Sequence, residues 1–399
     1  MKAAWLLVAL IFTAACGGGD ESGPRTTGNP GTGGSSSGGS AAIGGATATG
    51  GSAMGGSATA GSATGGAATA GSTTGGSAAG GSAGSAMAGG SAGSGGSSGG
   101  GPVTPPDMRT VVYLPEWRGA LSTWTTKLDF SRVTYVNLCF AGVDAGGNVS
   151  YKDQGLDEFV SAAHAKGGKV CMAIGGATVI DNGGVYATVL QDGMRDAFVG
   201  KLTQYAVDHQ LDCIDVDLEG NGVNQYYEAF VTSLATQLHG KNKQMTAAVS
   251  SWFGNKITDK AIQAFDFINV MAYDLHNPGG STQPVQSSSV AEATQEVDYW
   301  VGRGLAKNKA VFGVPFYGYK WAGAKGEALT YAEILQANPA AATQDQVDLG
   351  GNTVFLNSRT TIIEKAKLAK SYGGIMVWEL GQDAAGDASL LKAIADATM

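Results

Sequence analysis

The chain has 399 residues, 64 of them glycine, and a formal net charge of −8. The first 106 residues carry two basic and two acidic side chains, so the negative charge belongs to the remainder. An acidic remainder without a basic patch argues against nucleic acid or an anionic membrane as the main partner, and it favours a neutral substrate such as an uncharged polysaccharide.

The chain begins with the pattern of an export signal. Lys2 provides the positive charge, and the apolar run at 5–15 is too short to span a bilayer, which needs about 20 residues. The run ends in Thr13-Ala-Ala before Cys16, which resembles a bacterial lipoprotein box except that Thr13 stands where Leu is usual. We expect residues 1–16 to be a signal peptide, and two outcomes stay open: lipidation of Cys16 as a membrane tether, or ordinary cleavage. Both predict an extracellular or cell-surface protein, and the first predicts an outer-membrane lipoprotein.

Residues 17–106 are composed almost entirely of Gly, Ser, Ala and Thr, in loose GGSA and GSAT repeats. No aromatic residue lies between Phe12 and Tyr113. Such a segment cannot bury enough apolar surface to offset the entropy cost of ordering its backbone. We therefore expect a disordered tether with a reach of roughly 50 Å, followed by one catalytic domain at 107–399.

From residue 110 onward, β-rich apolar runs alternate with helical patterns. The predicted strands are 110–114, 133–140, 169–174, 213–218, 244–249, 267–273, 310–315 and 375–378, and the predicted helices are 157–165, 194–209, 224–239, 290–301 and 360–370. Eight strands with helices between most of them predict an α/β fold, a single (β/α)8 TIM barrel. An open doubly wound sheet is the alternative, but it would have a glycine-rich phosphate loop after the first strand, where this chain has PEWRG.

The fourth predicted strand carries the chemistry. Strand side chains alternate between faces, so Asp215, Asp217 and Glu219 point to one side, about 6.6 Å apart in succession. We call these three residues the acid row. In a barrel strand the apolar residues between them face the helices, so the acid row points inward, with Glu219 at the carboxyl end where barrel enzymes have their active sites. Burial and mutual repulsion favour retention of a proton, which a general acid needs.

Three carboxylates could also bind a cation, but no histidine accompanies them and no CxxC or His-rich spacing appears. We therefore expect no metal and no cofactor. Cys139, Cys171 and Cys213 lie inside apolar runs and are interpreted as small buried hydrophobic residues; one disulfide among them stays open.

The pattern DxxDxDxE at 212–219 resembles the signature of family 18 of the glycoside hydrolases, which includes bacterial chitinases. Further family motifs follow on the other predicted strands in order: YLPEW at 113–117, FA at 140–141, AIGG at 173–176, MAYD at 271–274, GVPFYG at 313–318 and GIMVWE at 374–379. The resemblance covers the chain from residue 110 to its end. Several short motifs in order on a barrel pattern are far more specific than any one of them.

The resemblance implies a retaining mechanism in which the substrate's own 2-acetamido group is the nucleophile. Glu219 would be the general acid and base, and Asp217 would hold the acetamido N–H. Tyr273 would donate its hydroxyl to the acetamido oxygen. Asp215 would share a proton with Asp217, assisted by Tyr113.

The resemblance also implies a set of sugar-contacting residues, in which Trp378 forms the floor under the distorted sugar and Asp274 holds the sugar by hydrogen bonds. The set is Tyr113, Phe140, Gly175, Gly176, Met271, Asp274 and Trp378. Core packing is the alternative role for Trp378 and Tyr273. Glu379 alternates with Trp378 and is interpreted as structural, and the roles of Trp117, Trp252 and Trp321 stay open between cleft, rim and core.

The chain departs from the family pattern at two positions. Ala173 stands where the family has a serine that stabilises the inner aspartate, and Cys213 stands where the family has glycine. In addition, about 58 residues separate Tyr317 from Ile375, so the insertion between the seventh and eighth strands is short. A short insertion predicts a shallow cleft and an endo-acting enzyme.

We therefore predict a secreted, monomeric chitinase that hydrolyses β-1,4-N-acetylglucosamine linkages in chitin or related oligosaccharides. An endo-β-N-acetylglucosaminidase acting on N-glycan chitobiose cores requires the same acetamide chemistry and stays open. A non-catalytic chitin-binding lectin on the same barrel is a third hypothesis, although such lectins typically lack the final glutamate of the motif.

Overall fold

A computed structural model of the protein describes residues 108–398. The predicted signal peptide, Cys16 and the tether at 17–106 lie outside the described residues. Among the described residues, no helix combines the length and the apolar character needed to cross a bilayer.

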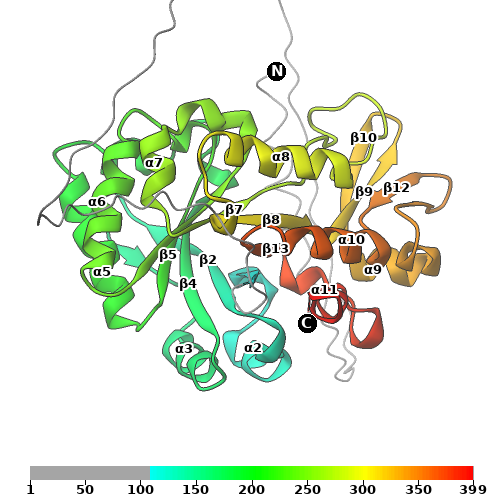
Figure 1. The fold of residues 1–399 in the computed structure, drawn as a ribbon, viewed down its shortest axis with the longest axis horizontal. Coiled ribbons are helices and arrows are strands. Elements are labelled where there is room, and N and C mark those ends of the chain that lie inside the picture. The colour runs from blue at the N-terminus through cyan, green and yellow to red at the C-terminus, as the bar shows by residue number, and fades with distance from the viewer. Residues whose placement is uncertain (1–107, 399) are drawn as a thin grey trace, which may run out of the picture. The chain divides into compact units, whose positions relative to one another are not determined.

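Eight parallel strands close into a barrel (Figure 1). Each strand pairs in parallel with its neighbours, and β1 closes the ring by pairing with both β2 and β13. The strands are β1 (Arg109–Pro115), β2 (Tyr135–Val143), β4 (Lys169–Gly176), β5 (Cys213–Leu218), β6 (Gln244–Val249), β7 (Phe267–Val270), β8 (Ala310–Pro315) and β13 (Gly374–Trp378). This confirms the predicted (β/α)8 barrel. The sixth barrel strand, β7, ends three residues earlier than predicted, because the Ala272 N–H bonds back to the Val270 carbonyl and the chain leaves the sheet.

Helices form the outer layer and bury the apolar faces of the strands. The longer ones are α3 (Leu156–His164), α5 (Arg195–Asp208), α6 (Tyr227–His239), α8 (Val290–Gly302), α10 (Arg359–Ala369) and α11 (Leu390–Thr398), and the shorter ones are α2 (Leu121–Lys127), α4 (Tyr186–Val189), α7 (Asp259–Ala264) and α9 (Tyr331–Ala337). Short 3-10 helices connect many elements: η3 (Glu116–Arg118), η4 (Phe130–Arg132), η5 (Ala177–Val179), η6 (Gly220–Gly222), η7 (Ser251–Lys256), η8 (Lys307–Lys309), η9 (Pro339–Ala342), η10 (Leu380–Gln382) and η11 (Gly386–Ala388). The five predicted helices are all present, with bounds shifted by three residues or fewer.

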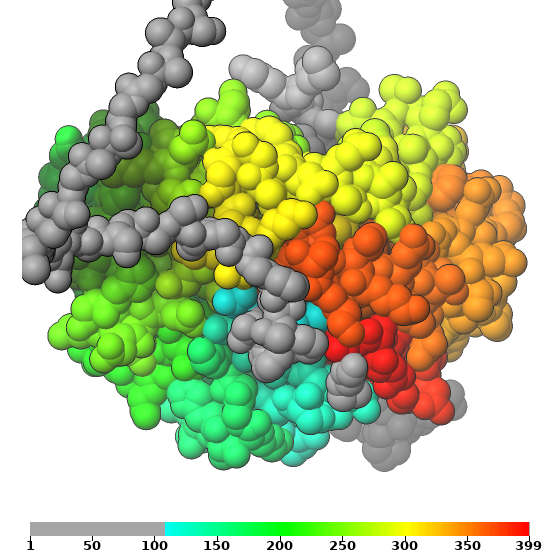
Figure 2. Space-filling model, viewed as in Figure 1, coloured from blue at the N-terminus to red at the C-terminus, as the bar shows by residue number. Residues whose placement is uncertain are grey.

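The segment between β8 and β13 folds into a small antiparallel sheet that was not predicted. Its strands are β9 (Tyr317–Ala322), β10 (Lys325–Thr330), β11 (Gln346–Asp348) and β12 (Thr353–Leu356), in the order β10-β9-β12-β11. Figure 2 shows this insertion (orange) forming a continuous surface with the neighbouring yellow and red-orange segments of the barrel. One further short strand, β3 (Val149–Ser150), pairs with the end of β2. The insertion is short, as predicted, but it has regular structure of its own.

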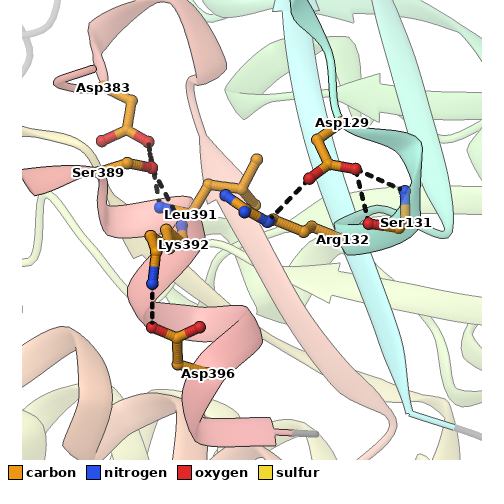
Figure 3. Close-up of polar contacts among 8 residues, drawn as sticks. All are labelled: Asp129, Ser131, Arg132, Asp383, Ser389, Leu391, Lys392 and Asp396. Carbon is orange, nitrogen blue, oxygen red and sulfur yellow. Dashed lines mark hydrogen bonds and ion pairs between the residues drawn. The ribbon is translucent and has the colours of Figure 1, made fainter. Parts of the chain in front are cut away.

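The C-terminal helix α11 packs against η4, near the first strands of the barrel. Asp383 caps α11, because its carboxylate accepts hydrogen bonds from the backbone N–H groups of Leu390 and Leu391. Figure 3 shows the bond from Leu391. On the η4 side, Asp129 pairs with Arg132 at 3.0 Å in the same view. Each of these polar contacts is local, so it is the packing of α11 against η4 that holds the end of the barrel beside its beginning.

The cysteine interpretation is corrected for two of the three residues. Cys171 on β4 and Cys213 on β5 lie directly opposite each other in the parallel register, and they form a disulfide across 42 residues of sequence. Both side chains face the barrel interior, where the pairing brings their Cα atoms to 4.5 Å. Cys139 is a free, buried thiol, as interpreted.

Candidate active site

Strand alternation on β5 directs the acid row inward. Ile214, Val216 and Leu218 belong to the apolar core between strands and helices, whereas Asp215 and Asp217 face the interior and are 0% and 3% exposed. Glu219 follows the strand at its carboxyl end, at the N-cap of η6. The predicted orientation of the acid row is therefore confirmed.

Asp215 lies at the base of the acid row and is held by three donors. Tyr113 donates its hydroxyl to Oδ2 at 2.6 Å, Thr246 donates its hydroxyl to Oδ1 at 2.5 Å, and the Asn269 amide lies 3.4 Å from Oδ1. Burial raises the pKa of Asp215, and the hydrogen bonds from Thr246 and Tyr113 oppose this rise.

Thr246 and Asn269 were missed in the sequence. A signal for both exists, because they are polar residues at inward-facing positions of β6 and β7, where apolar residues would ordinarily fill the barrel. Ala173 is the register neighbour of Asp215 on β4, and its methyl group offers no hydrogen bond. Thr246, the register neighbour on the other side, provides a hydroxyl instead.

Asp217 and Glu219 have perturbed acidities that depend on each other. Burial, then the charges of Glu219 and Asp215, raises the pKa of Asp217 well above its ordinary value. Burial, then the charge of Asp274, raises the pKa of Glu219 from 4.5 to about 7. Asp217 Oδ1 is buried and accepts no hydrogen bond within the described protein. A site with a proton-bearing carboxyl and an unused buried acceptor can both donate a proton and bind an N–H group.

Tyr273 and Asp274 follow β7 and lie on the same side as Glu219. Asp274 Oδ1 accepts hydrogen bonds from the hydroxyls of Tyr317 at 2.6 Å and Tyr319 at 2.8 Å. Burial raises the pKa of Asp274, and the two tyrosine hydrogen bonds oppose this rise. Tyr317 and Tyr319 lie on β9, in the antiparallel sheet of the insertion that was not predicted, so the insertion contributes directly to the site.

Glu219, Tyr273 and Asp274 line one cavity of about 180 Å³. Met271 lines it too, as does Trp252, for which a role in the cleft was one of the open alternatives; Ser250, Ser251 and Leu275 also line it and were not predicted. Trp252 is 41% exposed, so a flat apolar face is available to solvent beside the acid. The cavity combines an acid, hydroxyl groups and an aromatic wall, which suits a sugar with its polar edges and apolar ring faces.

Trp378 forms a second aromatic surface. Its ring lies 5.4 Å from the ring of Tyr113 and 6.2 Å from that of Phe140, measured between centroids, and its side chain is only partly buried. Gly176 lies against Phe140, since a Cβ at Gly176 would come within 2.6 Å of that ring. Gly175 lies in the same way against the backbone carbonyl of Asp217. These two glycines permit close packing around the acid row.

The other residues predicted for the site do not line this cavity: Asp215, Asp217, Tyr113, Phe140, Gly175, Gly176 and Trp378. The remaining residues that the sequence analysis weighed lie outside it too. Trp117 is 44% exposed, and Trp321 is buried in the core at 2% exposure. Glu379 is buried and forms an ion pair with Arg118 at 2.7 Å, which agrees with the structural role expected for it. Within residues 108–398, no three His, Cys, Asp or Glu side chains are grouped so that they could hold a metal ion.

The sequence model of the glycosyl hydrolases family 18 matches residues 109–383, which include every barrel strand and the whole acid row. The chain belongs to glycosyl hydrolase family 18. It is therefore a glycosidase-family protein with a TIM barrel, and the resemblance carried by the motifs is confirmed.

Individual chitinases and chitinase-like proteins are similar to the chain. The chain is 32% identical to the chitinase ChiB from the chitin utilization locus of Flavobacterium johnsoniae, with a TM-score of 0.67 over 73% of this chain and 94% of that one. It is 31% identical over 54% of its length to a chitinase-like effector of Moniliophthora roreri, and 29% identical over 53% to mouse chitotriosidase-1. The matches span 60% and 53% of the lengths of these two relatives.

Proposed function

We propose that the protein is a chitinase that hydrolyses β-1,4-N-acetylglucosamine linkages by a retaining, substrate-assisted mechanism. Glu219 carries the proposal, because its pKa of about 7 keeps a large share of this carboxyl protonated near neutral pH in a cavity that also contains Tyr273 and Asp274. The similarity to a bacterial chitinase over nearly all of that enzyme's length supports chitin as the substrate.

In the first step Glu219 donates its proton to the glycosidic oxygen of the leaving sugar. The carbonyl oxygen of the substrate's 2-acetamido group attacks the anomeric carbon as the bond to the leaving oxygen breaks, which gives an oxazolinium ion. Asp217 is suited to accept the acetamido N–H on its unused Oδ1, and its negative charge would offset the positive charge that develops on the ring.

The surrounding residues orient this reaction. Tyr273 would donate its hydroxyl to the acetamido oxygen, since within the described protein its only recorded hydrogen-bond partner is the weak acceptor Met376 Sδ at 3.8 Å. Asp215, held by Tyr113 and Thr246, would share a proton with Asp217 as the charge of the pair changes. Trp378 would provide the apolar floor under the sugar ring.

In the second step the deprotonated Glu219 takes a proton from water. The resulting hydroxide attacks the anomeric carbon from the face that the leaving group occupied, and the oxazolinium ring opens to regenerate the acetamide. Two inversions at one carbon retain the β configuration. Glu219 ends the cycle protonated and ready for the next linkage.

The test is a product profile on soluble chitin oligomers and on a high-mannose glycoprotein, with wild type, Glu219→Gln and the control Glu228→Gln on the surface of α6. We expect cleavage of chitin oligomers by wild type and by the control. Loss of the general acid should lower kcat by about 10² to 10⁴ in Glu219→Gln while oligomer binding persists. Release of the glycan alone would assign the N-glycan activity instead, and binding without turnover by wild type would assign a lectin.

We also propose that the enzyme is exported, tethered through residues 17–106 and endo-acting. Export and the tether are proposed from the sequence, with Cys16 as the lipid-bearing residue. Metabolic labelling with a radioactive fatty acid should mark wild type and leave Cys16→Ala unlabelled; equal labelling would contradict the lipid anchor.

The cleavage pattern is tested on long chitin oligomers. Early products of intermediate length would support endo cleavage, whereas only disaccharides from the first minutes would contradict it.

A further inference from the structure

A lysine on α10 is completely buried. Lys365 is 0% exposed, and its ammonium group donates to the Ser288 carbonyl at 2.7 Å, the Ser288 hydroxyl at 2.6 Å and Asn357 Oδ1 at 2.7 Å. All three donors of the protonated amine are therefore used, although burial lowers the pKa of Lys365 to about 7. Burying a lysine is costly unless it is fully paired, so this arrangement needs a reason beyond filling space.

The network continues from Lys365 to the candidate active site. The Ser288 hydroxyl donates to the Ala272 carbonyl at 2.6 Å. A carbonyl can only accept, so the Ser288 hydrogen must go to Ala272 and the Ser288 oxygen must accept from Lys365. The direction of both hydrogen bonds is thereby fixed. A single relay runs from α10 through Ser288 to the peptide group that immediately precedes Tyr273.

The segment that receives the relay leaves the sheet just before Ala272: the Met271 N–H still bonds to the Val249 carbonyl of β6, and beyond it Asp274 is held by its side chain, through Tyr317 and Tyr319. β7 ends at Val270, and the Ala272 N–H bonds back to the Val270 carbonyl instead of to a neighbouring strand. Asp274 then adopts a left-handed backbone conformation. Tyr273 and Asp274 thus stand on irregular backbone, although they line the same cavity as Glu219.

The relay also joins this segment to the insertion. Asn357, directly after β12, donates to the Ser288 carbonyl at 2.9 Å, and Gln286 donates to the Leu356 carbonyl at 2.6 Å. In Figure 1 the chain that leads into α8 runs beside the insertion and α10. Residues 271–289 are therefore held between the barrel and the insertion, with Lys365 at the junction.

We propose that Lys365 is a positioning residue: through Ser288 it fixes the Ala272 carbonyl and so sets the orientation of Tyr273 and Asp274 for the reaction. This inference rests on the proposed function, because the orientation matters only if those side chains act on a substrate. A displacement of about 1 Å in a reacting group can cost roughly 100-fold in rate, so loss of the relay should be visible in kcat.

The test compares Lys365→Met and Ser288→Ala with Lys309→Met in the full chain. Ser288→Ala removes only the hydroxyl between Lys365 and Ala272, and it leaves Lys365 the Ser288 carbonyl and Asn357 as acceptors. This variant therefore tests the relay even if Lys365→Met does not fold. The control lysine also bonds a single backbone carbonyl, that of Phe265 at 2.9 Å, but at the opposite end of the barrel strands. Two readouts are measured well below each variant's Tm: hydrogen exchange of peptides covering 271–289, and kcat and KM on chitin oligomers.

We expect both relay variants to exchange faster in 271–289 and to lose about tenfold or more in kcat with a smaller change in KM, while the control changes neither. The double variant should lose little more than the stronger single one, since both remove one relay. Unchanged exchange in 271–289 would overturn the inference without reference to any activity. Faster exchange with unchanged kcat would overturn it too, and absence of hydrolysis by wild type would instead overturn the proposed function.

Discussion

The charge of Asp274 should set part of the pH range over which the enzyme works. Burial and the Asp274 charge are the two causes that raise the pKa of Glu219 from 4.5 to about 7, and burial is the larger. The total rise is about 2.5 units, so Asp274 accounts for less than half of it, or up to about one unit. Asp274→Asn removes the charge and retains an oxygen that can accept the two tyrosine hydroxyls.

The direction in which the pH profile moves follows from the role of Glu219 as general acid. A general acid must be protonated at the start of the reaction, so kcat/KM falls as the pH rises through the pKa of Glu219 in the free enzyme. Removing the neighbouring negative charge lowers that pKa. The alkaline limb of the Asp274→Asn profile should therefore move to lower pH by up to about one unit.

The assay is kcat/KM on a soluble chitin oligomer from about pH 4 to about pH 9, a range that extends to both sides of the Glu219 pKa of about 7. The matched control is Asp298→Asn, since Asp298 also accepts a tyrosine hydroxyl, that of Tyr372 at 2.8 Å, but lies exposed on α8. The control profile should coincide with wild type. An alkaline limb that stays in place in Asp274→Asn would refute the electrostatic link between the two carboxyls, whatever happens to the maximal rate.

Three further outcomes are expected. Thr246→Val removes a hydroxyl donor from Asp215, so the pKa of Asp215 should rise and the acid limb of kcat/KM should move to higher pH by about one unit; a limb that stays in place would contradict the role of Thr246. Asp383→Ala removes the cap of α11 and should lower the free energy of unfolding in urea by about 1 to 2 kcal/mol, against little change for the exposed Asp387→Ala. Alkylation of the unfolded, unreduced protein should modify Cys139 and spare Cys171 and Cys213; labelling of all three would contradict the disulfide.

The barrel could be predicted because its strands repeat one strong signal. The bounds of β5, β6 and β8 agree with the sequence prediction at both ends, since each is a short apolar or alternating run with clear breaks. The acid row could be predicted for the same reason: alternation on a buried strand leaves little freedom in where a carboxylate points.

The short insertion was predicted, but its antiparallel sheet could not be, because its strands lack such a pattern. β10 reads KGEALT, and its residues are exposed or half-buried, so neither alternation nor an apolar run marks it as a strand. β10 forms a local hairpin with β9, but the pairing that completes this sheet, between β9 and the distant β12, appears only in the fold. The hydroxyls of Tyr317 and Tyr319, which hold Asp274, were missed for this reason.

Lys365 could not be found from the sequence for a different reason. It lies on a helix with ordinary spacing between polar and apolar residues, where lysine is usually exposed. Its burial depends on three acceptors from Ser288 and Asn357, which are distant from each other in the chain. Polar residues whose partners come from other elements carry no local signal.

The central claim is that Glu219, Asp217 and Tyr273 act together on a substrate whose own acetamide is the nucleophile. Proton NMR during the first minutes of chitin-oligomer hydrolysis measures this directly, because it resolves the anomeric configuration of the new reducing end before it equilibrates. We predict that the β-anomer appears first, as double inversion at one carbon requires. An α-anomer as the initial product would mean direct attack by water, and it would contradict the account.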